Sequence, residues 1–371
     1  MVIGIDASRA NKTERTGTEW YSYHVIQQLK AIVPADVTVR LYTREPLRGA
    51  LAELPPNWEE RVLAWPPTYL WTLLRLSLEM WLHPPDVLFV PAHGLPLVLP
   101  KRTVVTIHDI GFMRFSKLYK WRQVIYHRYV VRRALRQVAA IITVSEFSKK
   151  ELELVFHPRV TPVVIPLAHD RAAYHAAIPA EAVASVKNRY QLTLPYFIVV
   201  GRRERKKNIE RIVASFAEFK KIDTQGYALV LIGLEGYGWA EAKARINRAG
   251  CQTAVKVLQW VPEGDMSALL VGARALVFPS LYEGFGLPIL EAMAVGTPVI
   301  TSDKGAPREV AGKAALLIDP RSVESLVDAI KKIATDEIFS ATLRQAGFKR
   351  ATEFSWQKTA EATWQVLRST S

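Results

Sequence analysis

The sequence predicts an α/β protein with two doubly wound parallel sheets in succession. Three observations lead to this fold class. The chain has 371 residues, which is more than one ordinary core holds. Short runs of β-branched apolar residues alternate with longer segments of helical period, and this alternation occurs in two series. The runs are almost continuously apolar, as in parallel sheets that helices cover on both faces.

The first series starts with a strand at Val2–Ile5 and a helix at Gly17–Ile32. Further strands are expected at Val37–Tyr42, Val87–Val90, Val104–Ile107, Ile141–Val144 and Val163–Ile165. After Pro166 an alanine-rich stretch without strand pattern reads as a connector. We therefore expect one domain at residues 1–180 and a second at 181–355.

The second series repeats the architecture without repeating the sequence. Its strands are expected at Phe197–Val200, Ala228–Ile232, Val255–Leu258, Ala275–Val277, Val299–Thr301 and Ala315–Ile318. Two such halves leave a cleft between them, and ligands of open α/β sheets bind beyond the carboxyl ends of the strands. The residues directly after each strand are therefore the candidates for a site.

Composition limits the class of partner and the compartment. The net charge of +14 indicates an anionic partner. The excess of Lys plus Arg over Asp plus Glu is 7 on each side of residue 186, so it is not confined to one end of the chain. The single cysteine, Cys251, excludes a disulfide framework and a cysteine-based metal site. The chain opens directly as a strand without signal-peptide features, and no apolar run reaches the length of a membrane span. We expect a cytoplasmic protein, or one at the cytoplasmic face of the membrane.

The stretch "SLYEGFGLPILEAMAVGTP" from Ser280 to Pro298 predicts an anion seat. A loop follows the strand at 275–277, Pro288 suits a first helical turn, and the helix ends before Gly296. The amides of Phe285, Gly286 and Leu287 would then point out of the helix N-terminus, where the dipole favours an anion. The glycines Gly284 and Gly286 let a ligand approach the backbone closely.

Two carboxylates flank this seat. Glu283 lies in the loop and Glu291 one turn into the helix, so both can face one bound molecule. Acids repel a phosphate, but they grip the vicinal hydroxyls of sugars. A nucleotide sugar carries a diphosphate between two sugars and so offers both chemistries. The alternative is a solvated helix start, where acids are common for dipole reasons.

A basic cluster and a histidine follow two other strands. "GRRERKKN" at 201–208 places Arg202 and Lys207 where they can clamp a diphosphate, although an exposed basic loop is the alternative. His108 and Asp109 follow the strand at 104–107, and this histidine can hydrogen-bond a hydroxyl or phosphate near the reacting centre, or be purely structural. The pair His93 and His108 lacks metal-ligand spacing, and no aspartate-any-aspartate triplet is present. We expect metal-independent chemistry with no cofactor.

Together these residues resemble the GT-B glycosyltransferases of family 4. The block "PSLYEGFGLPILEAMAVGTPVITSD" is similar to the family signature, with Glu283 and Glu291 as its E-x7-E motif. Supporting matches are "GIDAS" at the start, "TIHDIGF" at 106–112, "VSEFSK" at 144–149, "VVG" with "KKN" at 199–208, and "FSW" at 354–356. The resemblance covers nearly the whole chain. The family's glycine loop is reduced to Gly17.

The resemblance implies two Rossmann-like domains, an N-terminal one for the acceptor and a C-terminal one for the donor, with a last helix at about 356–371 packing back on the first. It implies retaining transfer of a hexose from a nucleoside-diphosphate sugar to a hydroxyl of a glycan or lipid-linked acceptor. The resemblance also implies a role for each site residue. Glu283 would hold the transferred sugar, Glu291 would hold the ribose, and His108 would lie beside the anomeric centre. Arg202 and Lys207 would bind the diphosphate, the amides of Phe285, Gly286 and Leu287 would bind its distal phosphate, and the main chain of Val261 would contact the base. Retention by front-face attack, with the departing phosphate taking the proton, needs no protein base.

The segment Gly111–Gln137 holds eight Lys or Arg and no acid, interleaved with aromatic residues. Such a segment suits the surface of an anionic bilayer, and the stretch 65–82 adds three tryptophans. A half-buried helix with a solvated basic face is the alternative; no nucleic-acid module is visible. For function, the alternatives are a nucleotide-sugar epimerase or isomerase of the same fold and a catalytically silent binding protein.

Overall fold

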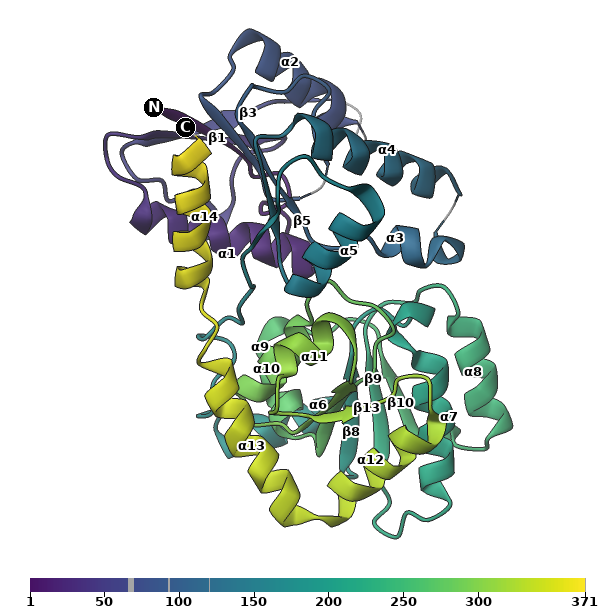
Figure 1. The fold of residues 1–371 in the computed structure, drawn as a ribbon. Coiled ribbons are helices and arrows are strands. Elements are labelled where there is room, and N and C mark those ends of the chain that lie inside the picture. Colours follow the sequence, from purple (N-terminus) through teal and green to yellow (C-terminus); the bar gives the residue numbers. More distant parts are fainter. Residues whose placement is uncertain (66–69, 93, 120, 371) are drawn as a thin grey trace. The chain divides into compact units, whose positions relative to one another are not determined.

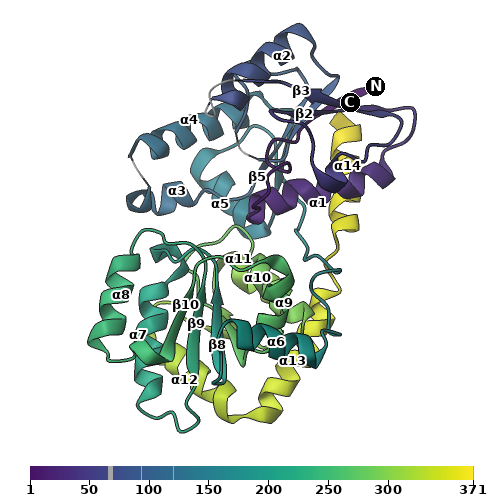
Figure 2. The ribbon, with the colours of Figure 1, turned by 180° about the vertical axis from the view of Figure 1, so that it is seen from behind.

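The computed structural model describes residues 1–65, 70–92, 94–119 and 121–370. The chain forms two compact units, one of Met1–Leu167 with Ser355–Ser371 and the other of Ala168–Phe354. Each unit is built around one parallel sheet with helices, so the predicted fold class is confirmed (Figures 1 and 2). His93, Lys120 and residues 66–69, which belong to segments singled out above, lie outside the described residues.

The first unit holds a seven-stranded parallel sheet in the order β3-β2-β1-β4-β5-β6-β7. The strands are β1 (Val2–Asp6), β2 (Thr38–Thr43), β3 (Trp58–Val62), β4 (Val87–Val90), β5 (Thr103–Ile107), β6 (Ala140–Thr143) and β7 (Val163–Val164). The order reverses direction beside β1, between β1 and β4, which is the switch point of a doubly wound sheet.

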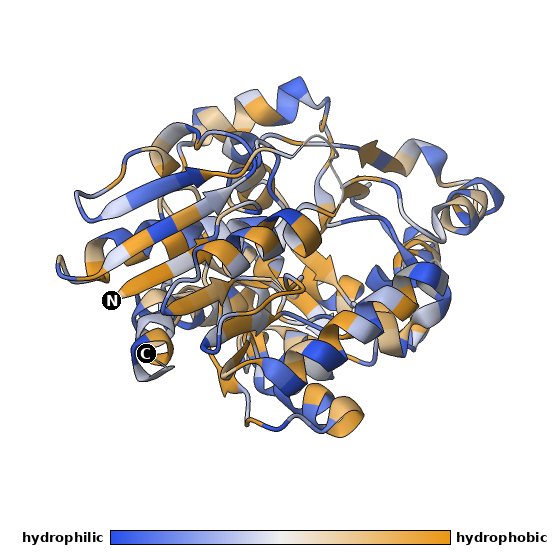
Figure 3. Cartoon of the chain, turned by 90° about the horizontal axis from the view of Figure 1, so that it is seen from above, coloured by the Kyte–Doolittle hydropathy of each residue, from blue (hydrophilic) through white to orange (hydrophobic). Residues whose placement is uncertain are grey.

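Strand β3 was missed by the apolar pattern. Its sequence WEERV carries three charges, and it occupies the edge of the sheet beside β2. In Figure 3 the strand that starts at the N label is orange, whereas the outermost strand two places away is mostly blue. Arg40 of β2 pairs with Glu59 of β3 across the two strands. An edge strand has solvent on one side, so it tolerates charge and loses the pattern of a buried strand.

Helices cover both faces of the first sheet. On one face, α2 (Leu76–Leu82), α4 (Trp121–Gln137) and α5 (Glu146–Phe156) share a core with the strands through residues such as Met80, Val131 and Leu152. On the other, α1 (Gly17–Ile32) lies beside α14 (Trp356–Thr370) (Figures 1 and 2). The ring of Trp356 stacks on His24 at 4.8 Å, and the Thr359 hydroxyl donates to the Pro166 carbonyl at 2.7 Å.

The second unit holds a six-stranded parallel sheet in the order β10-β9-β8-β11-β12-β13. The strands are β8 (Tyr196–Val200), β9 (Ala228–Ile232), β10 (Val255–Leu258), β11 (Ala275–Phe278), β12 (Val299–Ser302) and β13 (Leu316–Ile318). Helices α7 (Ile209–Lys220), α8 (Trp239–Arg248) and α12 (Val323–Thr335) bury one face together with Phe197, Leu229 and Val277. The remaining helices of this unit are α6 (Ala180–Arg189), α9 (Glu263–Val271), α10 (Leu287–Ala294), α11 (Gly305–Ala311) and α13 (Glu337–Ala351).

The second unit begins at Ala168, ahead of the boundary near residue 180 that the sequence suggested. Part of the alanine-rich connector is the reason, because it packs on this unit. Arg171 donates to the carbonyls of Thr352 and Phe354, at 3.4 and 3.3 Å, and Tyr174 is buried. A connector without strand pattern gives no sign of which domain it contacts, so the sequence could not locate this edge.

No helix within the described ranges is both long enough and apolar enough to cross a bilayer.

Candidate active site

The loop after β11 and the start of α10 have the geometry that the sequence predicts. Helix α10 begins at Leu287 with Pro288 in its first turn, and Gly286 precedes it with φ +124. A side chain at Gly286 would meet Ile289 at 3.1 Å and would be strained at this φ. Within the described residues, the amides of Phe285, Gly286 and Leu287 donate no hydrogen bond. They form a row of donors at the helix N-terminus, which suits an anion.

The basic loop after β8 lies directly against this anion seat. The Leu281 amide donates to the Lys206 carbonyl at 2.9 Å. Asn208 is buried with φ +66, and its side-chain amide donates to the carbonyls of Pro279 (3.1 Å) and Pro320 (2.6 Å). One side chain thus ties together the loops after β8, β11 and β13. Asn208 ends the motif quoted above without an assigned role; its left-handed backbone is a conformation that asparagine adopts more readily than most residues.

Lys207 and Glu283 form an ion pair in this seat. Lys207 Nζ lies 2.6 Å from Glu283 Oε1, and the two side chains are only 16% and 11% exposed. The ammonium also lies 4.7 Å from the centre of the Phe278 ring. The cation predicted for the diphosphate and the acid predicted for the sugar are therefore neighbours, so each influences the other's contact with a ligand.

The two adjacent arginines of the basic loop have opposite surroundings. Arg202 is exposed, as a ligand contact needs to be. Arg203 is 1% exposed; its guanidinium donates to the carbonyls of Gly233 and Leu258 and lies 4.5 Å from the Trp239 ring centre. One basic residue of the cluster therefore holds strand ends together and is not available to a ligand.

Glu291 shares its surroundings with two residues that sequence analysis missed. Burial, together with the nearby Glu263 carboxylate, raises the pKa of Glu291 to about 8. Tyr174 is buried near both acids, and burial followed by their charges raises the pKa of its hydroxyl. At neutral pH Glu291 is therefore mostly a neutral acid that can both donate and accept hydrogen bonds. Glu263 stands in the first turn of α9, so only the fold relates it to Glu291.

Val261, predicted to offer its main chain to a base, is buried in the loop between β10 and α9, while the neighbouring Trp260 is 49% exposed.

His108 lies at the carboxyl end of β5 in the first unit. Its Nε2 is 3.0 Å from the Pro91 carbonyl, and its ring centre lies 4.8 Å from that of Tyr21, with the two rings nearly perpendicular. Desolvation lowers its pKa, so the imidazole is neutral at pH 7. Because a carbonyl only accepts, Nε2 carries the proton and Nδ1 is left to accept a hydrogen bond. In this state Nδ1 can accept a hydrogen bond from a hydroxyl, which is one of the contacts predicted for His108.

Gly17, the remnant of the family's glycine loop, lies at the start of a capped helix. Gly17 opens α1, and Thr16 forms a capping box with Glu19. Arg9 and Lys12 pair with Glu19 at 3.1 and 3.4 Å.

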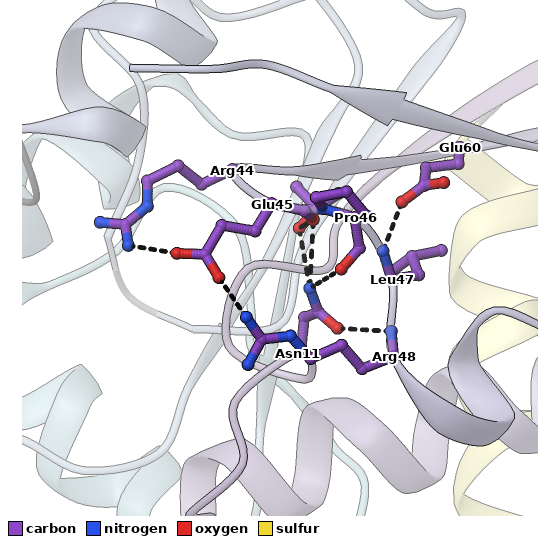
Figure 4. A network of polar contacts seen from close by, with 8 residues as sticks. Asn11, Arg44, Glu45, Pro46, Leu47, Arg48 and Glu60 are labelled. Atoms are coloured by element: carbon purple, nitrogen blue, oxygen red, sulfur yellow. Dashed lines mark hydrogen bonds and ion pairs between the residues drawn. The ribbon is translucent and has the colours of Figure 1, made fainter. Parts of the chain in front are cut away.

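Asn11 joins the loops that follow β1 and β2 (Figure 4). Its side-chain amide donates to the carbonyls of Glu45 (3.2 Å) and Pro46 (2.9 Å) and accepts from the Arg48 amide at 3.0 Å. Arg44 and Arg48 pair with the Glu45 carboxylate at 2.8 and 2.6 Å. The loops at this edge are therefore fixed by a polar network.

Across the described ranges, no group of three or more His, Cys, Asp or Glu side chains is placed to hold a metal ion. Metal independence stays a prediction, and His93 of the weak histidine pair lies outside these ranges.

Two family models together match most of the chain. Residues 183–350 match glycosyl transferases group 1, and residues 15–172 match glycosyltransferase family 4. Over 275 residues the chain is 30% identical to O-antigen chain mannosyltransferase B of Escherichia coli. The aligned region covers 73% of this chain and 72% of that protein. The chain belongs to the group 1 glycosyltransferases. The predicted family is confirmed, and the chain is accordingly a GT-B enzyme that transfers a sugar from a nucleotide-sugar donor.

Two further proteins are similar to this glycosyltransferase over nearly its whole length. O-antigen chain mannosyltransferase RfbU of Salmonella typhimurium is 25% identical over 372 residues, with 97% of this chain and 98% of that protein covered. Sucrose-phosphate synthase from Thermosynechococcus elongatus has the same fold with a TM-score of 0.78 at 20% identity, over 100% of this chain and 98% of that one.

The contrast between the adjacent arginines predicts opposite effects of the same substitution. Arg203→Met should lower the free energy of unfolding by about 3 kcal/mol, because it leaves buried carbonyls without their donor. Arg202→Met should change it by less than about 0.5 kcal/mol and weaken binding of a nucleoside diphosphate. Denaturant unfolding and calorimetric titration measure the two quantities; equal stability of the variants would refute the assignment.

The raised pKa of Glu291 predicts how stability depends on pH. Its pKa is about 8 in the folded chain against 4.5 for the ordinary group, so the folded state holds a proton that the unfolded state has lost in this window. The free energy of unfolding of the unliganded enzyme should therefore decrease as the pH rises from about 4.5 to about 8. This residue contributes at most about 1.4 kcal/mol of that decrease per pH unit. Glu291→Gln should remove that fall. The exposed Glu241→Gln is the matched control, and parallel pH profiles for Glu291→Gln and wild type would contradict the shift.

Proposed function

We propose that this glycosyltransferase moves mannose from a nucleoside-diphosphate sugar to a hydroxyl of a glycan or lipid-linked acceptor, with retention at the anomeric carbon and without a divalent metal. The choice of mannose rests on the names of the two O-antigen relatives. The observation that carries the proposal is the Lys207–Glu283 pair beside the amides of the α10 N-terminus, which donate no hydrogen bond to any described residue. Cation, amides and acid match the diphosphate and the sugar of one donor.

The donor contacts divide along the molecule. Arg202 and Lys207 neutralise the diphosphate, and the amides of Phe285, Gly286 and Leu287 bind its distal phosphate. Glu283 holds hydroxyls of the transferred sugar. Glu291 binds the ribose, either as a neutral acid or after losing its proton when the ligand binds. The main chain of Val261 forms hydrogen bonds with the base.

The proposed chemistry needs no protein base. The acceptor oxygen forms a bond to the anomeric carbon on the face from which the phosphate leaves, and the bond from that carbon to the phosphate oxygen breaks. The departing phosphate takes the acceptor's proton, so charge and protons balance without another group. Neutral His108 accepts a hydrogen bond from a sugar hydroxyl and orients it.

The leaving diphosphate is stabilised by fixed charge. Lys207 is largely buried, and such a cation, together with helix-terminal amides, acts in a medium where water screens little. This arrangement takes the place that a divalent ion has in metal-dependent transferases.

We also propose that the enzyme works in the cytoplasm at an anionic membrane surface, through the segment 111–137. Helix α4 supports this with exposed Trp121 and Tyr129 and exposed arginines, and its amphipathic pattern suits the interface. Arg132 is exposed, whereas Arg133 donates to the carbonyls of Pro96 and Leu97 and serves the fold. A test of this contact should therefore leave Arg133 in place.

A double-mutant cycle tests the paired roles of Lys207 and Glu283. Glu283→Gln should mainly lower kcat, and Lys207→Met should mainly raise KM for the donor. Because the charges lie 2.6 Å apart, the double variant should lose less than the sum of the single losses, by about 1–3 kcal/mol. Substitutions at the exposed pair Arg245 and Glu210 are the control and should leave both constants unchanged. Additive losses for Lys207 and Glu283 would argue against a shared donor contact.

Removal of metal tests the proposed electrostatics. Enzyme dialysed against a chelator should keep its rate of sugar transfer and gain nothing from added Mg²⁺, because Lys207, Arg202 and the helix amides carry the leaving charge. The rate is measured by release of the nucleoside diphosphate. Activity that disappears in chelator and returns with Mg²⁺ would overturn metal independence while leaving the transferase function intact.

A further inference from the structure

The helical rod formed by η2 (Trp71–Arg75) and α2 exposes apolar side chains and buries polar ones. Its inner face buries Ser77 and Glu79 together with apolar side chains. Its strongly exposed side chains are all apolar: Leu74 (39% exposed), Leu78 (44%), Trp81 (70%) and Leu82 (51%). Positions four, seven and eight residues apart lie on one side of a helix, so these residues form one stripe. A helix at a water interface normally places polar residues there.

The stripe continues onto a neighbouring loop. Leu97 and Val98 are 44% and 40% exposed. The Leu97 amide donates to Ser77 Oγ (2.6 Å) and to the Leu73 carbonyl (3.3 Å), so the loop runs beside the rod. We call the rod's stripe together with Leu97 and Val98 the apolar patch. Contiguous exposed apolar surface of this kind marks an interaction site.

A helix with exposed arginines contacts the loop of the apolar patch. Arg133 of α4 donates to the carbonyls of Pro96 (2.6 Å) and Leu97, so α4 contacts the same loop. The outward arginines of this helix are Arg122, Arg128, Arg132 and Arg136. Since residues 111–137 contain no acid, nothing in this segment offsets their charge.

We propose that the apolar patch inserts into the interfacial layer of an anionic lipid bilayer while the arginines of α4 bind its phosphate headgroups. The inference deepens the membrane contact proposed above by naming the element that enters the lipid. Apolar side chains next to unbalanced cations match a bilayer, which offers acyl chains below anionic headgroups. A second copy of this chain fits poorly, because pairing the patches would bring two cationic borders together.

Sedimentation with vesicles of phosphatidylcholine and phosphatidylglycerol tests the insertion at low salt and at about 1 M salt, where the Debye length is about 3 Å. The wild type should keep a salt-resistant share of its binding. The variant Leu78→Ser with Trp81→Ser should weaken that share by about tenfold or more, because the serines remove the buried apolar area. Its thermal midpoint and its transfer to a water-soluble acceptor should not change, since both positions are exposed.

Two matched variants separate the contributions. Ile338→Ser removes an apolar side chain that is 83% exposed in the other unit and should bind as the wild type does. The triple variant Arg128→Gln, Arg132→Gln and Arg136→Gln should lose the salt-sensitive share of binding and keep the salt-resistant share.

Each remaining outcome decides against a stated claim. Equal binding at high salt by the double serine variant and the wild type overturns insertion. In that case, weaker low-salt binding by the triple arginine variant shows that the arginines still bind the headgroups. Self-association of the wild type without lipid, lost in the double serine variant, makes the patch an interface between copies and also overturns insertion. Failure of the proposed function is seen separately, as absence of sugar transfer by the wild type without vesicles.

Discussion

The buried side-chain amide of Asn208 makes the contacts on which the geometry of the candidate site depends. It links the loops after β8, β11 and β13 through the carbonyls of Pro279 and Pro320. Together with the Leu281 amide, which donates to the Lys206 carbonyl, this contact holds the loop that carries Lys207 against the loop that leads into α10. Electrostatic stabilisation requires donors whose positions are set before the charge arrives. Asn208 therefore helps to set the position of the cationic loop relative to the helix terminus.

The Lys207–Glu283 pair is better explained by binding than by stability. Burying two charges costs several kcal/mol per ion, and their attraction repays this only with further hydrogen bonds. The helix amides beside the pair make none within the described residues, so the local charges and dipoles are incompletely satisfied. A diphosphate next to Lys207 would complete them. The neutral form of Glu291 has a related cause, because burial and the neighbouring Glu263 carboxylate both favour the protonated acid.

The sequence predicted the parts of the site that follow local rules. Helix α10 starts and stops where Pro288 and Gly296 indicate, because capping depends on neighbours in the chain. The roles of Asn208 and Glu263 depend on loops brought together by the sheet, and no local pattern encodes them. Strand β3 escaped for a related reason, since its charges are tolerated only because it forms an edge.

Net charge alone also overstates how much of the chain is free to bind anions. In each Arg-Arg pair, at 132–133 and at 202–203, the first arginine is exposed and the second donates to backbone carbonyls. Arg274 likewise donates to Ile333 near the end of α12, at 2.8 Å, and Arg350 to Val310 near the end of α11, at 2.9 Å. Cations at these ends satisfy carbonyls that the helices leave unpaired, and they complement the helix dipoles. A share of the positive charge thus stabilises the fold. The cations that stay accessible to an anion include Arg202 in the loop after β8 and the exposed arginines of α4.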